Sequence, residues 1–279
     1  MIPRKPMLAH KFDDSRVDWS LPVYIQPKLD GVRCLFTKDG AYSRAGKQFM
    51  NLAHIEVVLV PFFKQHPDVV LDGELYNHEL KNDFEKIISL VRKQKPTADD
   101  RLEAQELVQF HVYDYFDGVI YDSYKTRMQM LVLSDIYGRH IKYVEARKPH
   151  SYEVARNWHN IFLSKGYEGS IIRLDGLYKH GRSYDLMKFK DFCDAEATII
   201  GYEEGKGKRT NTLGKFLMLD DEGVEFGCPP GKGYNYKDLA NMLLEINDYI
   251  GQRATFTYFQ RTKAGSYRHP LYKCIRNYE

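Results

Sequence analysis

The stretch QPKLDGVRC, residues 26–34, joins two segments with the composition of β-strands through an Asp-Gly turn. Lys28 stands two residues before Asp30, and Arg33 follows three residues after it. A lysine at such a turn is commonly a solvated surface residue. Where a site keeps its amine neutral, a lysine is also a nucleophile. Both interpretations are open for this stretch alone, and the rest of the chain has to decide between them.

Length and composition indicate a folded chain of two domains. At 279 residues, one large and one small domain are expected. The 43% hydrophobic and 14% aromatic residues suffice for a substantial core, which excludes a disordered chain. The sequence has no run of about 18 apolar residues, and MIPRKPMLAHKF lacks the apolar core of a signal peptide. We therefore expect an intracellular protein with no membrane partner.

The cysteines and the net charge give only weak information about metal sites, disulfides and the kind of partner. The four cysteines Cys34, Cys193, Cys228 and Cys274 are scattered, without a C-x-x-C pair. This pattern favours reduced thiols that pack in the fold over a structural zinc site or a disulfide framework. A net charge of +3 leans weakly toward an anionic partner.

The pattern of predicted secondary structure changes near residue 191. Before that point it mixes helices, starting near Phe84, Ser123 and Val154, with strands predicted at 23–26, 32–38, 69–75, 109–116, 141–145, 170–174 and 186–190. After it come five predicted strands, at 195–202, 215–219, 224–228, 253–259 and 271–276, with one helix at 236–248. This order predicts an OB barrel, and a generic small β-barrel is the alternative. The fold class is therefore α+β, with domains at 1–191 and 192–279.

Five further segments follow QPKLDGVRC in order. They are YSRAG with Arg44, LDGEL with Glu74, VYDYF with Tyr113, EGSIIR with Glu168 and Arg173, and LMKFK with Lys188 and Lys190. Each one taken alone is better explained as a turn acid, a core tyrosine or a solvated strand face. Their joint occurrence in one order is far more specific than any single piece.

Together these segments resemble the superfamily of covalent nucleotidyltransferases, which contains ATP-dependent DNA ligases, RNA ligases and mRNA capping enzymes and carries the signature Lys-x-Asp-Gly-x-Arg. The segment GSYRHPLYKCIRNYE, 265–279, is similar to the C-terminal motif of ATP-dependent DNA ligases, and PMLA, 6–9, to the entry of their catalytic domain. The resemblance implies the minimal, phage or viral type of ligase. Its fold would be a nucleotidyltransferase domain of ATP-grasp-like antiparallel sheets, followed by a small OB-fold β-barrel.

The resemblance also implies a site. Lys28 would attack the α-phosphorus of ATP, with Asp30, Lys188 and Lys190 as further catalytic residues. The residues implied to bind the nucleotide are Gln26, Lys28, Arg33, Arg44, Glu74, Tyr113, Arg173, Lys188, Lys190 and Arg276. The implied ligands of Mg²⁺, or of Mn²⁺ in its place, are Asp30, Glu74 and Glu168.

The second domain is expected to bind nucleic acid. The loop GKGKRTNTLGK, 205–215, offers Lys206, Lys208 and Arg209 to a phosphate backbone. A solvated hairpin tip is the alternative interpretation of this loop. Arg276 matches the arginine that in the family orients the pyrophosphate during self-adenylation.

The function that the resemblance implies is ATP-dependent sealing of nicks in duplex DNA, through a lysyl-AMP intermediate and a DNA-adenylate. Such an enzyme would act as a monomer in DNA repair, replication or recombination, in the cytoplasm, or in the host cytoplasm if a phage encodes it. An RNA ligase is the alternative enzyme, and a non-catalytic OB-type nucleic-acid-binding protein is the alternative from another class. The intact lysine and carboxylates disfavour the latter. A capping enzyme is disfavoured by the Arg-x-Pro at Arg268–Pro270.

Overall fold

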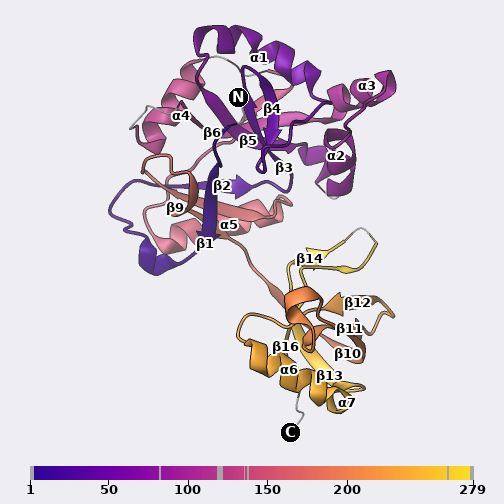
Figure 1. The fold of residues 1–279 in the computed structure, drawn as a ribbon. Helices are drawn as coiled ribbons and strands as arrows, with labels where there is room; N and C mark the ends of the chain where they lie inside the picture. Colours follow the sequence, from indigo (N-terminus) through magenta and orange to yellow (C-terminus); the bar gives the residue numbers. More distant parts are fainter. Residues whose placement is uncertain are drawn as a thin grey trace. The chain divides into compact units, whose positions relative to one another are not determined.

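The structure is a computed structural model that describes residues 3–81, 83–117, 122–134, 136, 138–262 and 264–276. The chain divides into two compact units, Met1–Lys190 and Asp191–Glu279 (Figure 1). Within the described residues, no helix is both long enough and apolar enough to cross a membrane.

The first unit contains two β-sheets. The strands of the first sheet, in spatial order, are β1 (Met7–Lys11), β9 (Gly181–Phe189), β8 (Gly169–Leu174) and β2 (Val23–Lys28). The strands of the second are β4 (Gly40–Ser43), β3 (Val32–Thr37), β5 (Val70–Tyr76), β6 (Gln109–Phe116) and β7 (Ile141–Tyr143). The helices are α1 (Ala53–Gln65), α2 (Phe84–Val91), α3 (Ala98–Leu107), α4 (Tyr124–Leu133) and α5 (Tyr152–Ser164), with 3-10 turns at Asp14–Arg16 and His78–Leu80.

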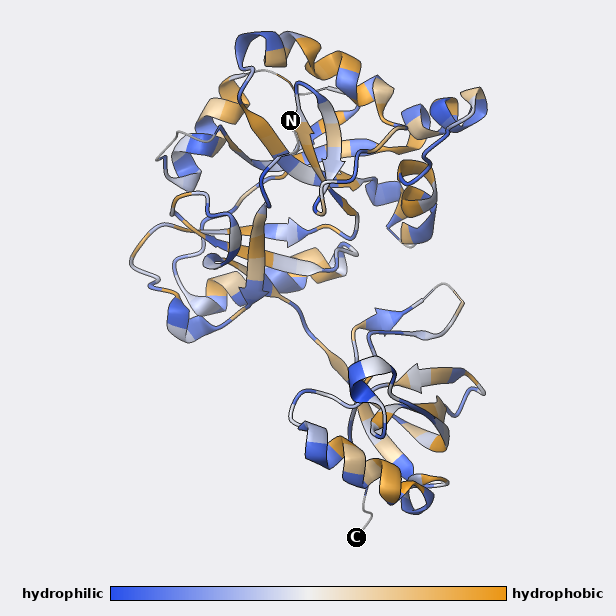
Figure 2. Ribbon diagram, viewed as in Figure 1, coloured by the Kyte–Doolittle hydropathy of each residue, from blue (hydrophilic) through white to orange (hydrophobic). Residues whose placement is uncertain are grey.

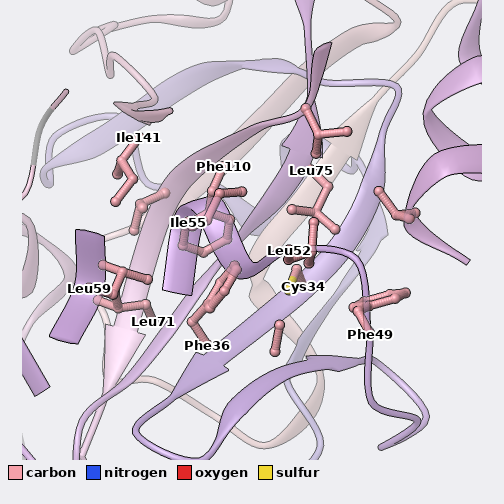
Figure 3. Close-up of a cluster of buried hydrophobic side chains, with 14 of the residues drawn as sticks. Cys34, Phe36, Phe49, Leu52, Ile55, Leu59, Leu71, Leu75, Phe110 and Ile141 are labelled. Atoms are coloured by element: carbon pink, nitrogen blue, oxygen red, sulfur yellow. The ribbon is translucent and has the colours of Figure 1, made fainter. Parts of the chain in front are cut away.

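The larger core of this unit lies between the second sheet and helices α1 to α4. Figure 3 shows Phe36 of β3, Leu71 of β5 and Phe110 of β6 meeting Ile55 and Leu59 of α1. All five are 0% exposed, so this sheet is a rigid base for whatever its other face presents. The alternation of buried and partly exposed residues along β6 follows from the period-2 geometry of a strand.

A smaller core lies between the first sheet and α5, where Ile25, Ile172 and Met187 are fully buried. A third cluster joins residues of both sheets: Leu29, Tyr76 and Val144, with Tyr113 and Tyr167 packed against them. This cluster holds the turn that follows Lys28 against the second sheet.

The second unit is an open five-stranded sheet. Its spatial order is β12 (Glu225–Cys228), β11 (Leu213–Leu219), β10 (Cys193–Glu204), β13 (Arg253–Tyr258) and β16 (Leu271–Ile275). A hairpin of β14 (Gln260–Arg261) and β15 (Tyr267–Arg268), a 3-10 turn at Gly207–Arg209, and helices α6 (Tyr236–Leu244) and α7 (Ile246–Tyr249) complete it. Orange, apolar segments of its strands and of α6 in Figure 2 enclose one core.

This unit is OB-like, as predicted, and its barrel is partly open. Among the described residues, the edge strands β12 and β16 meet only through an isolated parallel bridge between Pro230 and Tyr272. Tyr272 N–H donates to the carbonyl of Pro229 at 2.9 Å, and Gly231 N–H to that of Tyr272 at 3.0 Å.

All the strands and helices predicted from sequence are present, and several elements were not predicted. Helix α1 contains Pro61 and the β-branched run at Val57, Val58 and Val60, a composition that argues against a helix. Helix α3 buries only Ala104, so it shows no apolar face. Strand β1 pairs in parallel with β9, some 170 residues away, and short local sequence carries no signal of such a partner.

Candidate active site

Residues from both sheets of the first unit line a cavity of about 740 Å³. Strand β2 contributes Gln26 and Lys28, and the second sheet contributes Arg33, Glu74 and Tyr113. Further lining residues that the sequence had marked are Arg44, Arg173 and Lys188. The cavity therefore gathers most of the predicted nucleotide-binding residues of this unit at one place.

Lys28 and Lys190 share one carboxylate. Lys28 Nζ forms an ion pair with Glu168 Oε2, and Lys190 Nζ with Glu168 Oε1. The Glu168 side chain is only 6% exposed. Burial acts to raise its pKa, but the two ammonium groups prevail and lower the pKa of Glu168. Burial and the charge of Lys28 in turn lower the pKa of Lys190, against the opposing effect of Glu168.

The strand register places these three residues together. Strand β2 is antiparallel to β8, with Lys28 opposite Gly169, and β8 is antiparallel to β9, with Ser170 opposite Phe189. Glu168 N–H donates to the Lys28 carbonyl at 3.1 Å. Lys28 at the end of β2, Glu168 before β8 and Lys190 after β9 thus meet at one edge of the sheet.

Two glycines permit the close approach of these segments. A Cβ at Gly31 would lie 2.4 Å from the carbonyl oxygen of Leu75 and 2.7 Å from Cγ of Glu74, which no real side chain tolerates. Gly169 has φ of +148°, and a Cβ there would lie 2.5 Å from the carbonyl oxygen of Phe189. The glycines of the Asp-Gly and Glu-Gly pairs therefore serve to bring Glu74 and β9 against the lysine.

Glu74 is partly exposed to the cavity and receives a hydrogen bond from the Tyr113 hydroxyl at 3.2 Å. Loss of water around the carboxyl raises the pKa of Glu74 from 4.5 to about 7, although Lys28, Arg33 and Tyr113 act to lower it. The carboxyl is therefore divided between its two protonation states near neutral pH.

This raised pKa predicts a pH dependence of stability. Between pH 4.5 and about 7 the unfolded chain releases a proton from Glu74 that the folded chain retains, so stability falls as pH rises through this window. The full shift corresponds to about 3 kcal/mol. We expect Glu74→Gln to lose less stability than the parent between pH 5 and 7.5, measured by urea unfolding at both values. Equal losses in the two proteins would contradict the assignment.

The Arg33 guanidinium lines the cavity and is held by the buried carboxylate of Asp72. Its Nε donates to Asp72 Oδ1 at 2.7 Å and its Nη2 to Asp72 Oδ2 at 2.5 Å. Tyr178 also donates to Asp72 Oδ2, at 2.6 Å. The Arg33 guanidinium lies over one side of the Tyr113 ring, 5.3 Å from its centroid. Sequence reasoning marked Arg33 but missed Asp72 and Tyr178, and the Asp-Gly of LDGEL was the only signal for the former.

Gln26 and Arg173 form a buried pair at the wall of the cavity. Gln26 is 2% exposed and Arg173 is 4% exposed. Arg173 Nε donates to Gln26 Oε1 at 2.8 Å, and Arg173 Nη1 donates to Asp114 Oδ2 at 2.8 Å. Arg127 holds the other side of Asp114. Asp114 and Arg127 were not identified from sequence, because Arg127 lies 13 residues and Arg173 lies 59 residues along the chain from Asp114.

Three exposed cationic side chains, those of Arg44, Arg182 and Lys188, also line the cavity. Arg44 follows β4 and is exposed, and Lys188 is an exposed residue of β9. Arg182 also lines the cavity, and its Nη1 donates to the carbonyl of Ala9 at 2.7 Å. Arg182 was missed from sequence although it lies on the same strand as Lys188. These groups give the cavity an anion-binding character.

The three carboxylates predicted to bind a metal are not assembled as one cluster. In the part of the chain that the structure describes, no group of three or more His, Cys, Asp or Glu side chains could hold a metal ion. Glu168 lies between two ammonium groups, and Glu74 accepts from Tyr113. Mg²⁺ is commonly held by one or two carboxylates with substrate phosphates, so a site of three carboxylates is not required for a metal that arrives with a nucleotide.

In the second unit, Arg276 forms an ion pair with Glu196 of β10. Lys206, Lys208 and Arg209 are exposed and lie at or next to the 3-10 turn Gly207–Arg209. Local hydrogen bonds shape this turn: Thr210 Oγ1 donates to the Gly207 carbonyl at 2.7 Å, and Gly205 N–H to that of Thr212 at 2.8 Å. The turn therefore presents three cations to solvent.

Two family models match the chain. The model described as ATP dependent DNA ligase domain matches residues 6–190, and the model described as DNA ligase OB-like domain matches residues 204–276. The first match covers the two-sheet unit, and the second lies within the open-sheet unit.

Relatives and solved structures agree with these matches. A DNA ligase of Haemophilus influenzae is 26% identical, over 95% of this chain and 90% of its own length. A DNA ligase of Enterobacteria phage T4 is 24% identical over 90% of this chain, which spans 63% of that relative. In fold, the chain is similar to a solved structure described as DNA binding with a minimal scaffold in Lig E DNA ligases, with a TM-score of 0.81, 24% identity and coverage of 99% of this chain and 100% of that one.

Proposed function

Since this chain belongs to the family of ATP-dependent DNA ligases, we propose that it seals nicks in duplex DNA by way of an AMP group carried on Lys28. The observation that supports this most strongly is the position of Lys28. Its amine lies in the cavity, beside Glu168 and Lys190. Exposed cations that line the same cavity, Arg44 and Lys188, are available to bind a nucleotide phosphate.

Three transfers make up the reaction. First, Lys28 Nζ bonds to the α-phosphorus of ATP, the bond to pyrophosphate breaks, and the amine loses a proton. Next, an oxygen of the 5′-phosphate at the nick attacks the same phosphorus, the N–P bond breaks, and the Lys28 nitrogen takes up a proton from solvent. Last, the 3′-hydroxyl attacks the 5′-phosphate, AMP leaves, and the hydroxyl proton goes to solvent. Atoms balance over the three steps, and no oxidant or reductant is required.

The chain's own residues supply position and charge. Glu168 holds the Lys28 amine in place and accepts from it. Lys188 and Lys190 are suited to the α-phosphate oxygens, where negative charge accumulates in every step. Glu74, with a raised pKa, is suited to a ribose hydroxyl as donor or acceptor.

Asp30 and Glu168 would hold a Mg²⁺ or Mn²⁺ ion together with phosphate oxygens of the nucleotide. When bound, the metal supplies positive charge that stabilises the negative charge developing on the phosphates. Arg276 is suited to a pyrophosphate oxygen, and for that it would exchange its contact with Glu196.

Labelling tests this proposal directly. The protein is incubated with α-labelled ATP, GTP or NAD⁺ and a divalent metal, and protein-bound label is measured with and without acid. We expect label from ATP alone, lost in acid as a phosphoramidate is. Sealing is then compared on nicked duplex DNA, nicked duplex RNA and single-stranded RNA ends. Faster joining of either RNA substrate would replace the DNA-ligase assignment by an RNA ligase.

The loop cations predict the salt dependence of sealing. A protein that contacts several phosphates can lose on the order of a thousandfold in affinity for DNA when salt is raised from low to moderate. Replacing Lys206, Lys208 and Arg209 by Ala should lower that slope, measured as log affinity for nicked DNA against log salt, while self-adenylation is unchanged. The charge-matched control replaces the exposed lysines Lys38, Lys64 and Lys95. If both triple variants reduce the slope equally, the loop makes no specific contact.

A further inference from the structure

Two acidic residues of β10 pair with two basic residues near the C-terminal end of the second unit. Glu196 forms its ion pair with Arg276, and Asp194 Oδ2 lies 2.9 Å from Lys273 Nζ. Strand β13 lies between β10 and β16, so both pairs reach across it (Figure 1). The four side chains are between 22% and 55% exposed, so both pairs are open to solvent.

The backbone of Arg276 is held by the sheet, whereas its side chain can change partner. Its N–H donates to the carbonyl of Arg253 in β13 at 2.8 Å, which continues the pairing of β13 with β16. In the register of the sheet, Glu196 lies opposite Thr255, and Thr255 lies opposite Cys274. The Arg276 guanidinium therefore extends diagonally over β13 to reach Glu196. A turn of this side chain toward another anion requires the contact with Glu196 to break.

Arg253 lies beside the same carboxylate but has a closer partner of its own. Its Nη1 and Nη2 donate to the two carboxylate oxygens of Asp221 at 2.5 Å each, while its Nε is 3.7 Å from Glu196 Oε2. Bidentate pairing of this kind is the stronger arrangement. The Glu196 charge is therefore not required to neutralise Arg253, and the basic group closest to it is that of Arg276.

The contact between Glu196 and Arg276 opposes the role that Arg276 has in the proposed function. A guanidinium recognises carboxylates and phosphates with the same planar set of donors. While Glu196 holds Arg276 Nη1, that donor and part of the positive charge are not available to the pyrophosphate of ATP. Exposed ion pairs contribute little to stability, so the pyrophosphate, with its greater negative charge, can displace the carboxylate. Each self-adenylation then includes the loss of this ion pair.

We propose that Glu196 is an internal competitor of ATP for Arg276, which slows self-adenylation by holding the guanidinium until the pyrophosphate group displaces it. The inference rests on the proposed function, because it requires Arg276 to contact the pyrophosphate. It adds a residue of the second unit that sets the rate of the first transfer only. The two later transfers involve no pyrophosphate, so removal of the Glu196 charge should leave them unchanged.

The test measures the rate constant of protein labelling with α-labelled ATP and Mg²⁺, at an ATP concentration well below saturation. In Glu196→Gln the side chain keeps its length and loses its charge. We expect labelling to become about two- to fivefold faster, which is the range that an exposed ion pair can contribute. Single-turnover sealing of a pre-adenylated nick should keep the parental rate.

Asp194→Asn is the matched control, because it removes the other acidic charge of β10 that pairs with the C-terminal strand. It changes the partner of Lys273 rather than that of Arg276, and should label at the parental rate. A second control tests the route: Arg276→Met should label more slowly than the parent, and adding Glu196→Gln to it should give no gain. Raising salt should bring the Glu196→Gln and parental rates together, because salt screens exposed charges.

An unchanged or slower labelling rate in a folded Glu196→Gln variant would overturn the inference. An equal gain in Asp194→Asn would do so too, since it would indicate a general effect of charge. A gain that persists with Arg276→Met, or parental labelling by Arg276→Met alone, would show that Glu196 does not act through Arg276.

Thermal unfolding checks the fold of each variant independently of labelling. If Glu196→Gln does not fold, Glu196→Asp replaces it in the test. Its shorter carboxylate should draw back from Arg276 and speed labelling, and a rate at or below the parental one contradicts the inference. Failure of the parent to take label from any nucleotide would instead reject the proposed function itself.

Discussion

Lys28→Ala is expected to reduce self-adenylation by roughly a thousandfold or more, because a methyl side chain cannot form the bond to phosphorus. The same variant should still seal a nick that already carries AMP on its 5′-phosphate, since the lysine is the nucleophile in the first step only. The measurements are protein labelling with α-labelled ATP, and single-turnover joining of a pre-adenylated nick.

The control for this variant is Lys38→Ala, which removes an exposed lysine between β3 and β4 and should leave both reactions unchanged. Loss of pre-adenylated sealing to the same extent as loss of labelling would mean that Lys28 acts in more than the first step. Retained labelling would move the nucleophile to another residue.

Glu168→Ala is expected to impair both reactions, which distinguishes it from Lys28→Ala. Without this carboxylate, the ammonium groups of Lys28 and Lys190 are close cations with their common partner removed, and they should move apart. A displacement of about 1 Å at a reacting group can cost about a hundredfold in rate, so labelling should fall by at least that factor. Sealing of a pre-adenylated nick should also fall, because Lys190 loses its position at the phosphate.

Glu153→Ala, at an exposed glutamate in the first turn of α5, is the matched control and should retain both rates. The unfolding midpoint of each variant must be compared, since removing one partner of a buried ion pair destabilises a protein. If Glu168→Ala keeps sealing while losing only the labelling step, then Glu168 serves the nucleophile alone and Lys190 is held by other groups.

Local sequence marked positions of the site but not their roles. Lys28 precedes an Asp-Gly turn and Glu168 precedes a strand rich in β-branched residues, and each of these short motifs alone is also typical of a solvated surface. The strand order that brings them together was available only through the resemblance to a family. Roles that depend on residues far apart were not predictable. In the sequence, Asp114 is a single acidic residue within the aromatic-rich segment of β6. No adjacent residue indicates that Arg127 and Arg173 are its partners.

The fold, too, was predictable from local sequence in some elements and not in others. Strands with alternating apolar residues, such as β6, were predicted within a residue or two. Helix α1 was missed because tertiary burial of Ile55, Leu59 and Phe62 overrides the weak helix propensity of its valines and its proline. The OB-like second unit was predicted from the order of its strands and one helix, but the single bridge between Pro230 and Tyr272 was not, because strand counting does not show which edge residues meet.

Because Lys28 and Lys190 share Glu168, their site can be assembled only after a long part of the chain has been synthesised. Lys28 and Glu168 are 140 residues apart, and Lys190 is a further 22 residues on. A ribosome therefore makes Lys28 long before the two residues that hold it, and contacts of such sequence separation slow folding because of their loop-closure entropy. A nascent or truncated chain that stops before Glu168 carries the lysine without its partner. If Lys28 is the nucleophile as proposed, adenylation requires a chain synthesised at least as far as Lys190, with β2 paired to β8.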